Sequence, residues 1–369
     1  MNETLGIIMA GNNSLELGEI TKPRPVGAVP VASRYRIVDF MLSNMVNSGI
    51  ERVGIPTQTH YRSLMDHLGS GGAWDLNRKR HGLVVLPPYM GGGGEAQGDL
   101  DVLNSILDYV KNSNRRYVLI TGCDMIFNTT FDDMLEAHKR NKADITVMYH
   151  NMPDCSELVH HVGLKTDETD RIVDIEIDPI RAFSSQISMG IYLMEREFLE
   201  YHLNRCLSRG LHDFAKDILL REKDRLRIFG YEYKGYVGRV YNIASYYSCN
   251  MDMLKPEITG ELFDGKEPVF TKVKDQVPTI YGEEANVKNS MVADGCIING
   301  TVENCIIFRG VQIEEGTTIK NSIIMQNSLI QAGVTLNHAI LDKSVIVRKN
   351  KTLIGQENYP VVVGKNTVV

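Results

Sequence analysis

A repeat in the last quarter of the sequence constrains the fold more than any other feature. Its units recur at steps of 15, 17 and 17 residues, and each is followed by two apolar residues: Val287-Lys288-Asn289-Ser290, Val302-Glu303-Asn304-Cys305, Ile319-Lys320-Asn321-Ser322 and Leu336-Asn337-His338-Ala339. Short apolar pairs, small residues and glycine turns near this period are typical of a stacked parallel β-helix. Because a single coil cannot bury its apolar face, the coils must form one domain, which we expect over residues 281–369.

Before the repeat, the sequence alternates apolar runs with helical patterns. The pattern predicts strands at residues 5–10, 52–55, 117–121 and 144–149, and helices at 37–48, 100–110 and 131–141. This alternation indicates an α/β domain with a mostly parallel, Rossmann-like sheet over residues 1–250. Ligands of such sheets bind beyond the carboxyl ends of the strands, so the loops after Ala10 and Thr121 should carry the chemistry. Residues 251–280, rich in proline, glycine and charge, are expected to be a connector.

Composition excludes several classes of protein. The net charge of −6 and the pI near 6.0 argue against binding to nucleic acid or to an anionic membrane through bulk charge. No apolar run is long enough to span a bilayer. The cysteines are scattered without a C-x-x-C pair, which favours reduced thiols over disulfides or a zinc site. Met1 leads into an apolar run without the basic stretch that begins a secretory signal, so we expect a cytoplasmic protein.

Several motifs in the α/β part are more specific, and they resemble one enzyme family. They are Tyr35-Arg36-Ile37-Val38-Asp39-Phe40, Asn47-Ser48-Gly49-Ile50, Trp74-Asp75-Leu76, Val85-Leu86-Pro87-Pro88-Tyr89, Ser188-Met189-Gly190-Ile191-Tyr192 and Asp213-Phe214 with Lys216-Asp217. In this order they resemble the bacterial ADP-glucose pyrophosphorylases, the glucose-1-phosphate adenylyltransferases of glycogen synthesis. The resemblance implies a nucleotidyltransferase domain followed by a left-handed β-helix, normally assembled as a tetramer.

The chain departs from this family in the loop expected to hold the triphosphate. The family has a loop of the form A-G-G-x-G-S/T-R-L, and at these positions the chain retains only Gly11 of the glycines, with Ser14 at the third glycine position and Glu16 at the arginine. Glycines let backbone amides approach phosphates, and arginine neutralises them. A glutamate 4 Å from another anion instead costs about 1 kcal/mol in water and about 4 kcal/mol at an effective dielectric constant of 20.

Three further departures concern the sugar phosphate and the metal. The family's two phosphate-facing lysines align with Val26 and Asp178, and its second metal-binding aspartate aligns with Arg239. Only Asp124 remains of the two carboxylates that hold Mg²⁺ in the family. It is therefore a residual metal candidate, with a solvated loop carboxylate as the other interpretation. Because two carboxylates normally hold the ion that screens the phosphates, the resemblance implies a degenerate catalytic site.

A basic group near the start of the chain suggests a different site. Lys22, Arg24, Arg34 and Arg36 are close in sequence, and in the family the positions of Arg24 and Arg36 lie where sugar-phosphate effectors bind. These two residues are our effector-binding candidates. Surface charge without a ligand is the competing interpretation.

Taken together, the resemblance and the departures favour a regulatory, catalytically impaired subunit of glucose-1-phosphate adenylyltransferase. Such a chain would require no cofactor of its own and would join a homologous catalytic subunit, which uses Mg²⁺, in a mixed tetramer. One alternative is an active sugar-phosphate nucleotidyltransferase with a modified active site. Another is an acyltransferase working through the β-helix, whose only histidine is His338; that residue is expected in the Ser/Cys slot of its coil.

Overall fold

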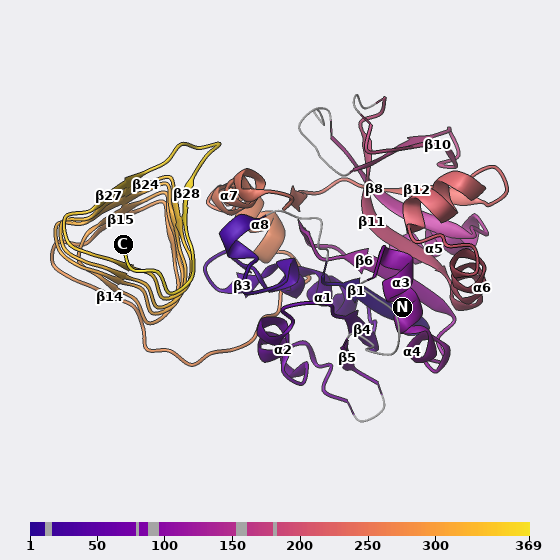
Figure 1. Cartoon of the computed structure of the whole chain (residues 1–369), viewed down its shortest axis with the longest axis horizontal. Helices are drawn as coiled ribbons and strands as arrows, with labels where there is room; N and C mark the ends of the chain where they lie inside the picture. Colours follow the sequence, from indigo (N-terminus) through magenta and orange to yellow (C-terminus); the bar gives the residue numbers. More distant parts are fainter. Residues whose placement is uncertain (12–16, 79–80, 88–95, 153–160, 180–182) are drawn as a thin grey trace.

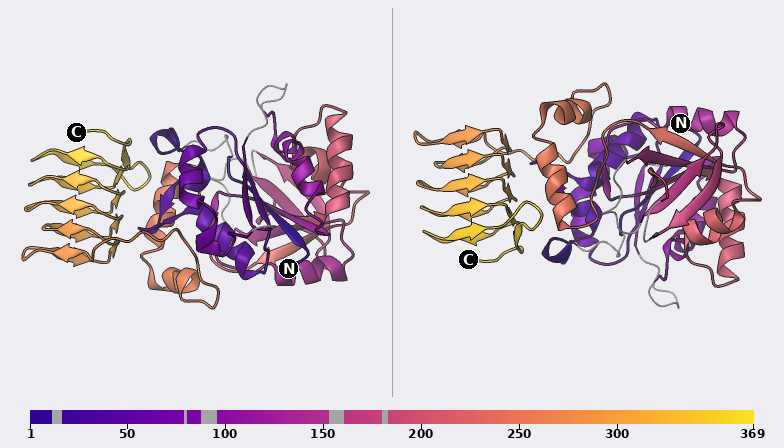
Figure 2. Two further views of the ribbon diagram at one scale, coloured as in Figure 1. Left: turned by 90° about the horizontal axis from the view of Figure 1, so that it is seen from below. Right: turned by 90° about the horizontal axis from the view of Figure 1, so that it is seen from above.

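A computed structural model describes residues 1–11, 17–78, 81–87, 96–152, 161–179 and 183–369. Figure 1 shows an N-terminal α/β part and, beside it, a coiled C-terminal part seen along its axis as a triangle with one side facing the α/β part. Figure 2 shows the same coils from the side as a regular stack. Within the described ranges, no helix is long and apolar enough to cross a membrane.

The α/β part is built on a mixed sheet of nine strands formed by described residues. The order is β10-β9-β11-β6-β1-β4-β5, with β8 beside β11 and β12 beside β8. The strands are β1 (Thr4–Met9), β4 (Val53–Pro56), β5 (Leu83–Leu86), β6 (Tyr117–Gly122), β8 (Ile145–Asn151), β9 (Val162–Thr166), β10 (Ile172–Ile177), β11 (Gln186–Glu195) and β12 (Ile228–Tyr233). Strands β6, β1, β4 and β5 are mutually parallel, as predicted. Strand β11, however, runs antiparallel to both β6 and β8.

Helices and short elements surround this sheet. They are α1 (Ile37–Asn47), α2 (Arg62–Leu68), α3 (Asp99–Ser105), α4 (Leu107–Lys111), α5 (Asp132–Arg140), α6 (Arg196–Leu207), α7 (Ile243–Asp252), α8 (Pro256–Phe263), η1 (Gly18–Ile20), η2 (Val26–Ala28), η3 (Gly72–Trp74), η4 (Ala215–Leu220), β2 (Pro30–Val31), β3 (Tyr35–Arg36), β7 (Met125–Ile126) and β13 (Gly238–Arg239). The single helix predicted at 100–110 is wrong, because it breaks at Ile106 into α3 and α4. Beside the break, the Ser105 hydroxyl donates to the carbonyl of Val102 at 2.6 Å, a local bond that competes with helical geometry.

The segment expected to be a plain connector contains ordered, buried structure. Helix α7 ends inside it, and α8 lies wholly within it. The Leu262 side chain of α8 is fully buried in the same apolar cluster as Phe40 of α1. Residues 251–264 thus pack with α1, because α8 buries its apolar side chains in the same core.

The C-terminal part consists of three parallel five-stranded sheets, as expected for a left-handed β-helix. The first face is formed by β14 (Ile280–Tyr281), β17 (Ile297–Ile298), β20 (Gln312–Ile313), β23 (Leu329–Ile330) and β26 (Ile346–Val347). The second face is formed by β15 (Asn286–Lys288), β18 (Thr301–Glu303), β21 (Thr318–Lys320), β24 (Thr335–Asn337) and β27 (Thr352–Ile354). The third face is formed by β16 (Met291–Val292), β19 (Ile306–Ile307), β22 (Ile323–Ile324), β25 (Ala339–Leu341) and β28 (Val361–Val363).

The sequence repeat corresponds to one corner of these coils. Asn289, Asn304 and Asn321 have φ values of 41°, 53° and 45°, a left-handed conformation that asparagine tolerates well. The Asn289 amide donates to the Asn304 side chain, and the Asn304 amide donates to the Asn321 side chain. His338, with φ 47°, occupies the next position of this asparagine row. The expectation that it fills the Ser/Cys slot was therefore wrong by one residue.

The third face of the β-helix packs directly on the α/β part. The outward side chains of Ile306, Ile323 and Ile340 are fully buried in the apolar cluster that also contains Phe40 and Met125. Their neighbours, such as Ile307 and Ile324, point inward into the core of the coil. The two parts therefore share one continuous core, which fixes their relative position.

Candidate functional site

Strand register places Gly11 and Asp124 at the same edge of the sheet. Strands β1 and β6 are parallel neighbours, and Met9 lies opposite Gly122. The chain therefore leaves both strands at the same level, two residues later, at Gly11 and Asp124. The predicted site residues Ser14 and Glu16 fall outside the described part of the chain.

Asp124 and Arg239 are brought together by a short strand pair. Strand β7 directly follows Asp124 and pairs antiparallel with β13, so that Met125 lies opposite Arg239. The Val240 amide donates to the Asp124 carbonyl at 2.7 Å. The Arg239 Nε atom lies 3.6 Å from Asp124 Oδ2. Two positions that are 115 residues apart in sequence thus share one site, as their motifs predicted.

The surroundings of Asp124 are not those of a solvated loop. The residue is 9% exposed, and burial raises its pKa above the usual range, with the Arg239 guanidinium acting in the opposite direction. This geometry replaces the solvated-loop interpretation. The arginine compensates a buried carboxylate in the manner of an internal ion pair.

These donors do not fit a magnesium site of the two-carboxylate kind. Mg²⁺ demands oxygen ligands in near-octahedral geometry, and here a guanidinium stands beside the single carboxylate. No group of three or more histidine, cysteine or acidic side chains suited to a metal occurs in the described ranges.

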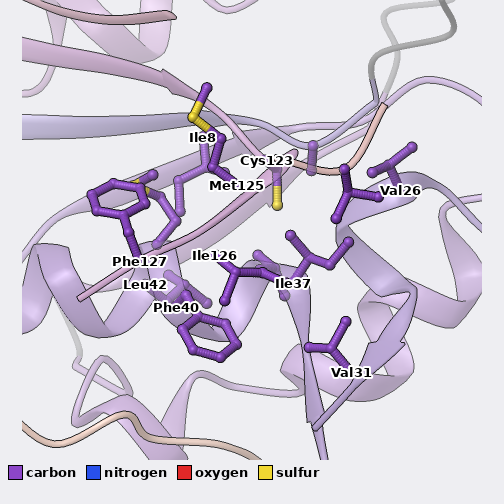
Figure 3. Packing of buried hydrophobic residues seen from close by; sticks show 14 of the residues in the cluster. Ile8, Val26, Val31, Ile37, Phe40, Leu42, Cys123, Met125, Ile126 and Phe127 are labelled. Atoms are coloured by element: carbon purple, nitrogen blue, oxygen red, sulfur yellow. The ribbon is translucent and has the colours of Figure 1, made fainter. Parts of the chain in front are cut away.

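The wall next to Asp124 is apolar where the family has a phosphate-facing lysine. Val26 begins η2, is 4% exposed and lies in one apolar cluster with Cys123, the neighbour of Asp124 (Figure 3). Its partner Gly27 is also tightly packed, since an added Cβ would come within 2.8 Å of the Cys123 sulfur. Position 26 therefore holds no cationic side chain, and Val26 packs in the apolar core instead.

Asp178, at the family's other lysine position, lies at a different place in the sheet. It follows the end of β10, which is separated from β6 by β9 and β11. The residue is exposed, has φ 47°, and its amide donates to the His161 carbonyl at 2.9 Å. The structure thus groups Gly11, Val26, Asp124 and Arg239 and leaves Asp178 on the turn after β10.

Sequence reasoning missed one titratable residue, Asp99, at the start of α3. Its carboxylate accepts the Phe214 amide at 2.8 Å, and burial, the main cause, raises its pKa to about 7. The preceding Gly98 is required sterically, because a Cβ would come within 2.1 Å of the His212 carbonyl oxygen. A Gly-Asp pair before a helical pattern is the signal that could have found it.

The effector candidates lie at the junction of the two parts. Arg24 is only 2% exposed, and its Nη2 donates to both carboxylate oxygens of Asp342 at 2.9 Å. The Arg36 Nη1 donates to the Ser63 carbonyl at 2.7 Å and to its hydroxyl at 3.1 Å. Lys22, in contrast, pairs with Glu19 on the surface.

Other cations come from distant segments: the charge of Arg36 acts on Lys343 and on Lys274, and the charge of Arg309 acts on Lys274. We use the name interdomain cationic cluster for Arg24, Arg36, Lys274, Arg309 and Lys343. The pKa of Lys343 is lowered to about 6, mainly by burial and also by the charges of Arg36, Arg24 and Lys274, with the Asp342 carboxylate acting in the opposite direction. Burial, opposed by Asp39, also lowers the pKa of Arg36 to about 10. No local signal could have revealed the last three members, which come from the connector and two separate coils.

His338 takes part in the contact between the two parts. The Tyr247 hydroxyl donates to the Asn321 carbonyl at 2.7 Å, and it lies 3.0 Å from the His338 Nδ1. Because the single hydroxyl proton goes to the carbonyl, Nδ1 is the donor to the tyrosine oxygen. This bond across the junction gives the histidine a structural role and does not favour the acyltransferase alternative.

Comparisons with known proteins match the α/β part and the β-helix to two different family models. Residues 5–251 match the family described as "Nucleotidyl transferase", and residues 275–359 match "GlmU-like, C-terminal hexapeptide". The chain is 34% identical over 317 residues to "Glycogen biosynthesis protein GlgD" of Bacillus subtilis (strain 168), covering 86% of this chain and 82% of that protein. It is also 34% identical over 320 residues to "Glucose-1-phosphate adenylyltransferase" of Pseudothermotoga lettingae, covering 85% of this chain and 76% of that enzyme.

Proposed function

Because this chain belongs to the nucleotidyl transferase family, we propose that it is a regulatory, catalytically impaired subunit of a glucose-1-phosphate adenylyltransferase in glycogen biosynthesis. In this proposal it assembles with a homologous catalytic chain in a mixed tetramer and modulates ADP-glucose synthesis from ATP and glucose 1-phosphate. The chain itself needs no cofactor, whereas its partner uses Mg²⁺.

The observation that carries the proposal is the Arg239–Asp124 contact at 3.6 Å. The guanidinium beside this carboxylate supplies a fixed positive charge at the position of the family's second metal-binding carboxylate. It cannot orient two phosphate oxygens for in-line attack as Mg²⁺ does. The apolar Val26 wall removes a second source of positive charge. Since each lost electrostatic donor costs about 10²-fold in rate, two losses at one site leave little turnover.

The interdomain cationic cluster supports the regulatory half of the proposal. Five cations converge where the third face of the β-helix meets the α/β part, and burial disfavours the charge of several of them. A bound sugar phosphate would relieve this repulsion through charge-assisted hydrogen bonds. Arg36 and Lys343 are the members we expect to contact it, while Arg24 holds its place through Asp342.

The test is an assay of the purified chain alone and with a catalytic relative. We expect ADP-glucose formation by the chain alone at background level, at least about 10³-fold below the relative, because both charge sources are missing. When the two chains are co-expressed, they should co-elute, and the complex should differ from the catalytic chain in rate or in apparent effector affinity. Asp124→Asn, in a variant whose circular dichroism matches that of the parent, should not change the activity of the complex.

The alternative, an active nucleotidyltransferase, makes opposite predictions in the same assay. Robust synthesis by the chain alone with Mg·ATP, abolished by Asp124→Asn, would overturn the regulatory proposal. If the chain does not co-elute with a catalytic relative, the proposed mixed tetramer is wrong.

Anion binding at the cluster should depend on pH through Lys343. The pKa of Lys343 in the folded chain, about 6, lies below the ordinary lysine value of 10.5. At a pH between these two pKa values the unfolded chain therefore binds more protons than the folded one. At pH 8 the side chain is neutral in the folded protein without a ligand. An anion restores the charge, so binding takes up a proton. Affinity should therefore fall as the pH rises above 6, by up to about tenfold per pH unit.

Sulfate is the suitable probe, because its own charge stays constant over this range. Titration calorimetry in two buffers of different ionisation enthalpy should report the proton uptake. Lys343→Met should abolish both the uptake and the pH dependence, whereas Lys22→Met, at an exposed surface pair, should change neither. An unchanged pH profile in Lys343→Met would exclude this lysine from the site.

A further inference from the structure

The edge of the sheet opposite to Asp124 contains a cavity. Strand β6 begins at Tyr117 and ends at Gly122, two residues before Asp124, so its two ends lie at different edges of the sheet. Tyr117 lies opposite Glu195 at the end of β11, and β8 and β12 begin at this same edge. The cavity has a volume of about 450 Å³ and is lined in part by α5 and α6, on the side away from the β-helix (Figure 1). A cavity of this size suits a small molecule.

The wall of the cavity carries two buried polar side chains. Tyr117 and His138 both line it, and each is only 3% exposed. The His138 Nδ1 lies 2.8 Å from the Thr146 hydroxyl. Within the described ranges, neither the His138 Nε2 nor the Tyr117 hydroxyl forms a hydrogen bond. Because polar groups in such positions normally form hydrogen bonds, these two atoms are suited to contact a bound molecule.

Charged side chains surround this wall, and the cations outnumber the carboxylates by two. Both carboxylates are already neutralised, in the ion pairs Arg116–Glu195 and Arg227–Asp144, each at 2.8 Å. The excess positive charge therefore belongs to Lys139 and Lys142, which form no ion pair with another described residue. A molecule that carries two negative charges would balance it.

The two unbalanced lysines are held at the end of α5. The Lys139 Nζ lies 5.3 Å from the centre of the Tyr117 ring, and the Arg116 guanidinium lies 5.1 Å from the same ring. Lys142 has φ 46°, in the position after a helix that glycine usually occupies. Its amide donates to the Lys139 carbonyl at 3.2 Å, which closes the helix. Backbone strain of this kind is characteristic of binding sites.

We propose that this cavity binds a small molecule in which a planar aromatic ring carries a phosphate monoester. A phosphate monoester has a charge of about −1.5 to −2 at pH 7, which matches the excess charge of Lys139 and Lys142. The phosphate accepts the Tyr117 hydroxyl proton in a hydrogen bond. The ring of the ligand lies against Phe198, which is the largest apolar side chain of the wall.

The charge count disfavours two other classes of ligand. A neutral molecule would leave both lysines unbalanced. A triphosphate would bring surplus negative charge close to Asp144 and Glu195, and like charges at this distance repel. The cavity shares no residue with the Asp124 site or with the interdomain cationic cluster. The inference therefore holds whether or not the chain regulates an enzyme.

The experiment titrates the full chain with phenyl phosphate at neutral pH. Saturation-transfer NMR on the ring protons of the ligand reports contact between the ring and the protein. We expect a dissociation constant of about 0.1–1 mM, as is usual for so small a ligand. Phenol, titrated in the same way, and inorganic phosphate, added as a competitor, should each bind at least about tenfold more weakly, because each keeps only one of the two recognised groups.

Three variants locate the binding site. Lys139→Gln should weaken phenyl phosphate binding about tenfold, because it removes a charge-assisted contact to the phosphate. The matched control is Arg140→Gln, which removes the next cation of α5, an exposed side chain outside the cavity, and should bind as the parent does. Phe198→Leu should weaken phenyl phosphate binding about fivefold without changing the affinity of inorganic phosphate. The circular dichroism of all three should match that of the parent.

Four outcomes would overturn the proposal. The parent chain could transfer no saturation to the ring protons, or inorganic phosphate could compete as strongly as phenyl phosphate, which would exclude recognition of the ring. Arg140→Gln could weaken binding as much as Lys139→Gln, so that only the general charge of α5 matters. Finally, Lys343→Met could abolish the ring signal while Lys139→Gln preserves it, which would assign the ligand to the interdomain cationic cluster. None of these measurements uses ADP-glucose synthesis or a catalytic partner, so they succeed or fail separately from the proposed regulatory function.

Discussion

Replacing Arg239 with aspartate should destabilise the chain and, at the same time, create a response to magnesium. Asp124 is buried, and Arg239 is the charge that lowers its pKa against the effect of burial. In Arg239→Asp, two carboxylates would face each other without a cation, at a cost of about 3 kcal/mol in the free energy of unfolding at neutral pH. A divalent cation would relieve this repulsion, so Mg²⁺ at about 100 times its dissociation constant should restore about 2.7 kcal/mol.

Thermal unfolding with and without millimolar MgCl₂ measures both effects. The parent chain should show no change in Tm with Mg²⁺ beyond that given by a monovalent salt at equal ionic strength. Arg239→Asn is the matched control, because it removes the cation without adding a carboxylate; it should lose stability and gain no magnesium response. An equal response to Mg²⁺ in the parent chain would mean that Asp124 already holds the ion.

Removing Arg24 should cause the largest loss of stability. The Arg24 guanidinium and the Asp342 carboxylate are almost fully buried, at 2% and 0% exposure, and are joined by two hydrogen bonds of 2.9 Å. Among the described residues, Arg24→Ala leaves the buried Asp342 charge with the Lys343 amide, at 2.7 Å, as its remaining donor. We expect a loss of about 3–5 kcal/mol in the free energy of unfolding, measured from the urea midpoint.

The pair also tests how the two parts are held together. Arg24 lies between η1 and η2 of the α/β part, and Asp342 lies in the β-helix. Arg24→Ala should therefore separate unfolding into two transitions. Fluorescence of the single tryptophan, Trp74, reports on the α/β part, and circular dichroism reports on both parts. Arg24→Met combined with Asp342→Leu should recover most of the loss, since neither charge is then stranded. Lys22→Ala, at an exposed pair with Glu19, should cost less than about 0.5 kcal/mol. A small effect of Arg24→Ala would show that the shared apolar core alone fixes the junction.

The sequence by itself determined the features that depend on local periodicity. The repeat that starts at Val287 predicted the coil, because inward and outward positions alternate along every strand and the left-handed corner favours asparagine. Beyond periodicity, the family resemblance implied that Asp124 and Arg239 occupy the two positions of one metal site, and the β7–β13 pair brings them to 3.6 Å. The break at Ile106 was nevertheless missed, because hydrophobic periodicity carries no information about a local hydrogen bond such as that from the Ser105 hydroxyl to the Val102 carbonyl.

The tertiary structure alone decided which charges meet and which apolar face is covered. Arg24 and Asp342 are 318 residues apart, and Lys343 has a displaced pKa only because folding buries it beside Arg36. The outward rows of the first and third faces are both apolar, so their sequences do not differ in kind; docking of the α/β part buries Ile323 and leaves Ile297 exposed. The physical reason is that burial and Coulomb interaction depend on distances in space, which only the packing of the two parts sets.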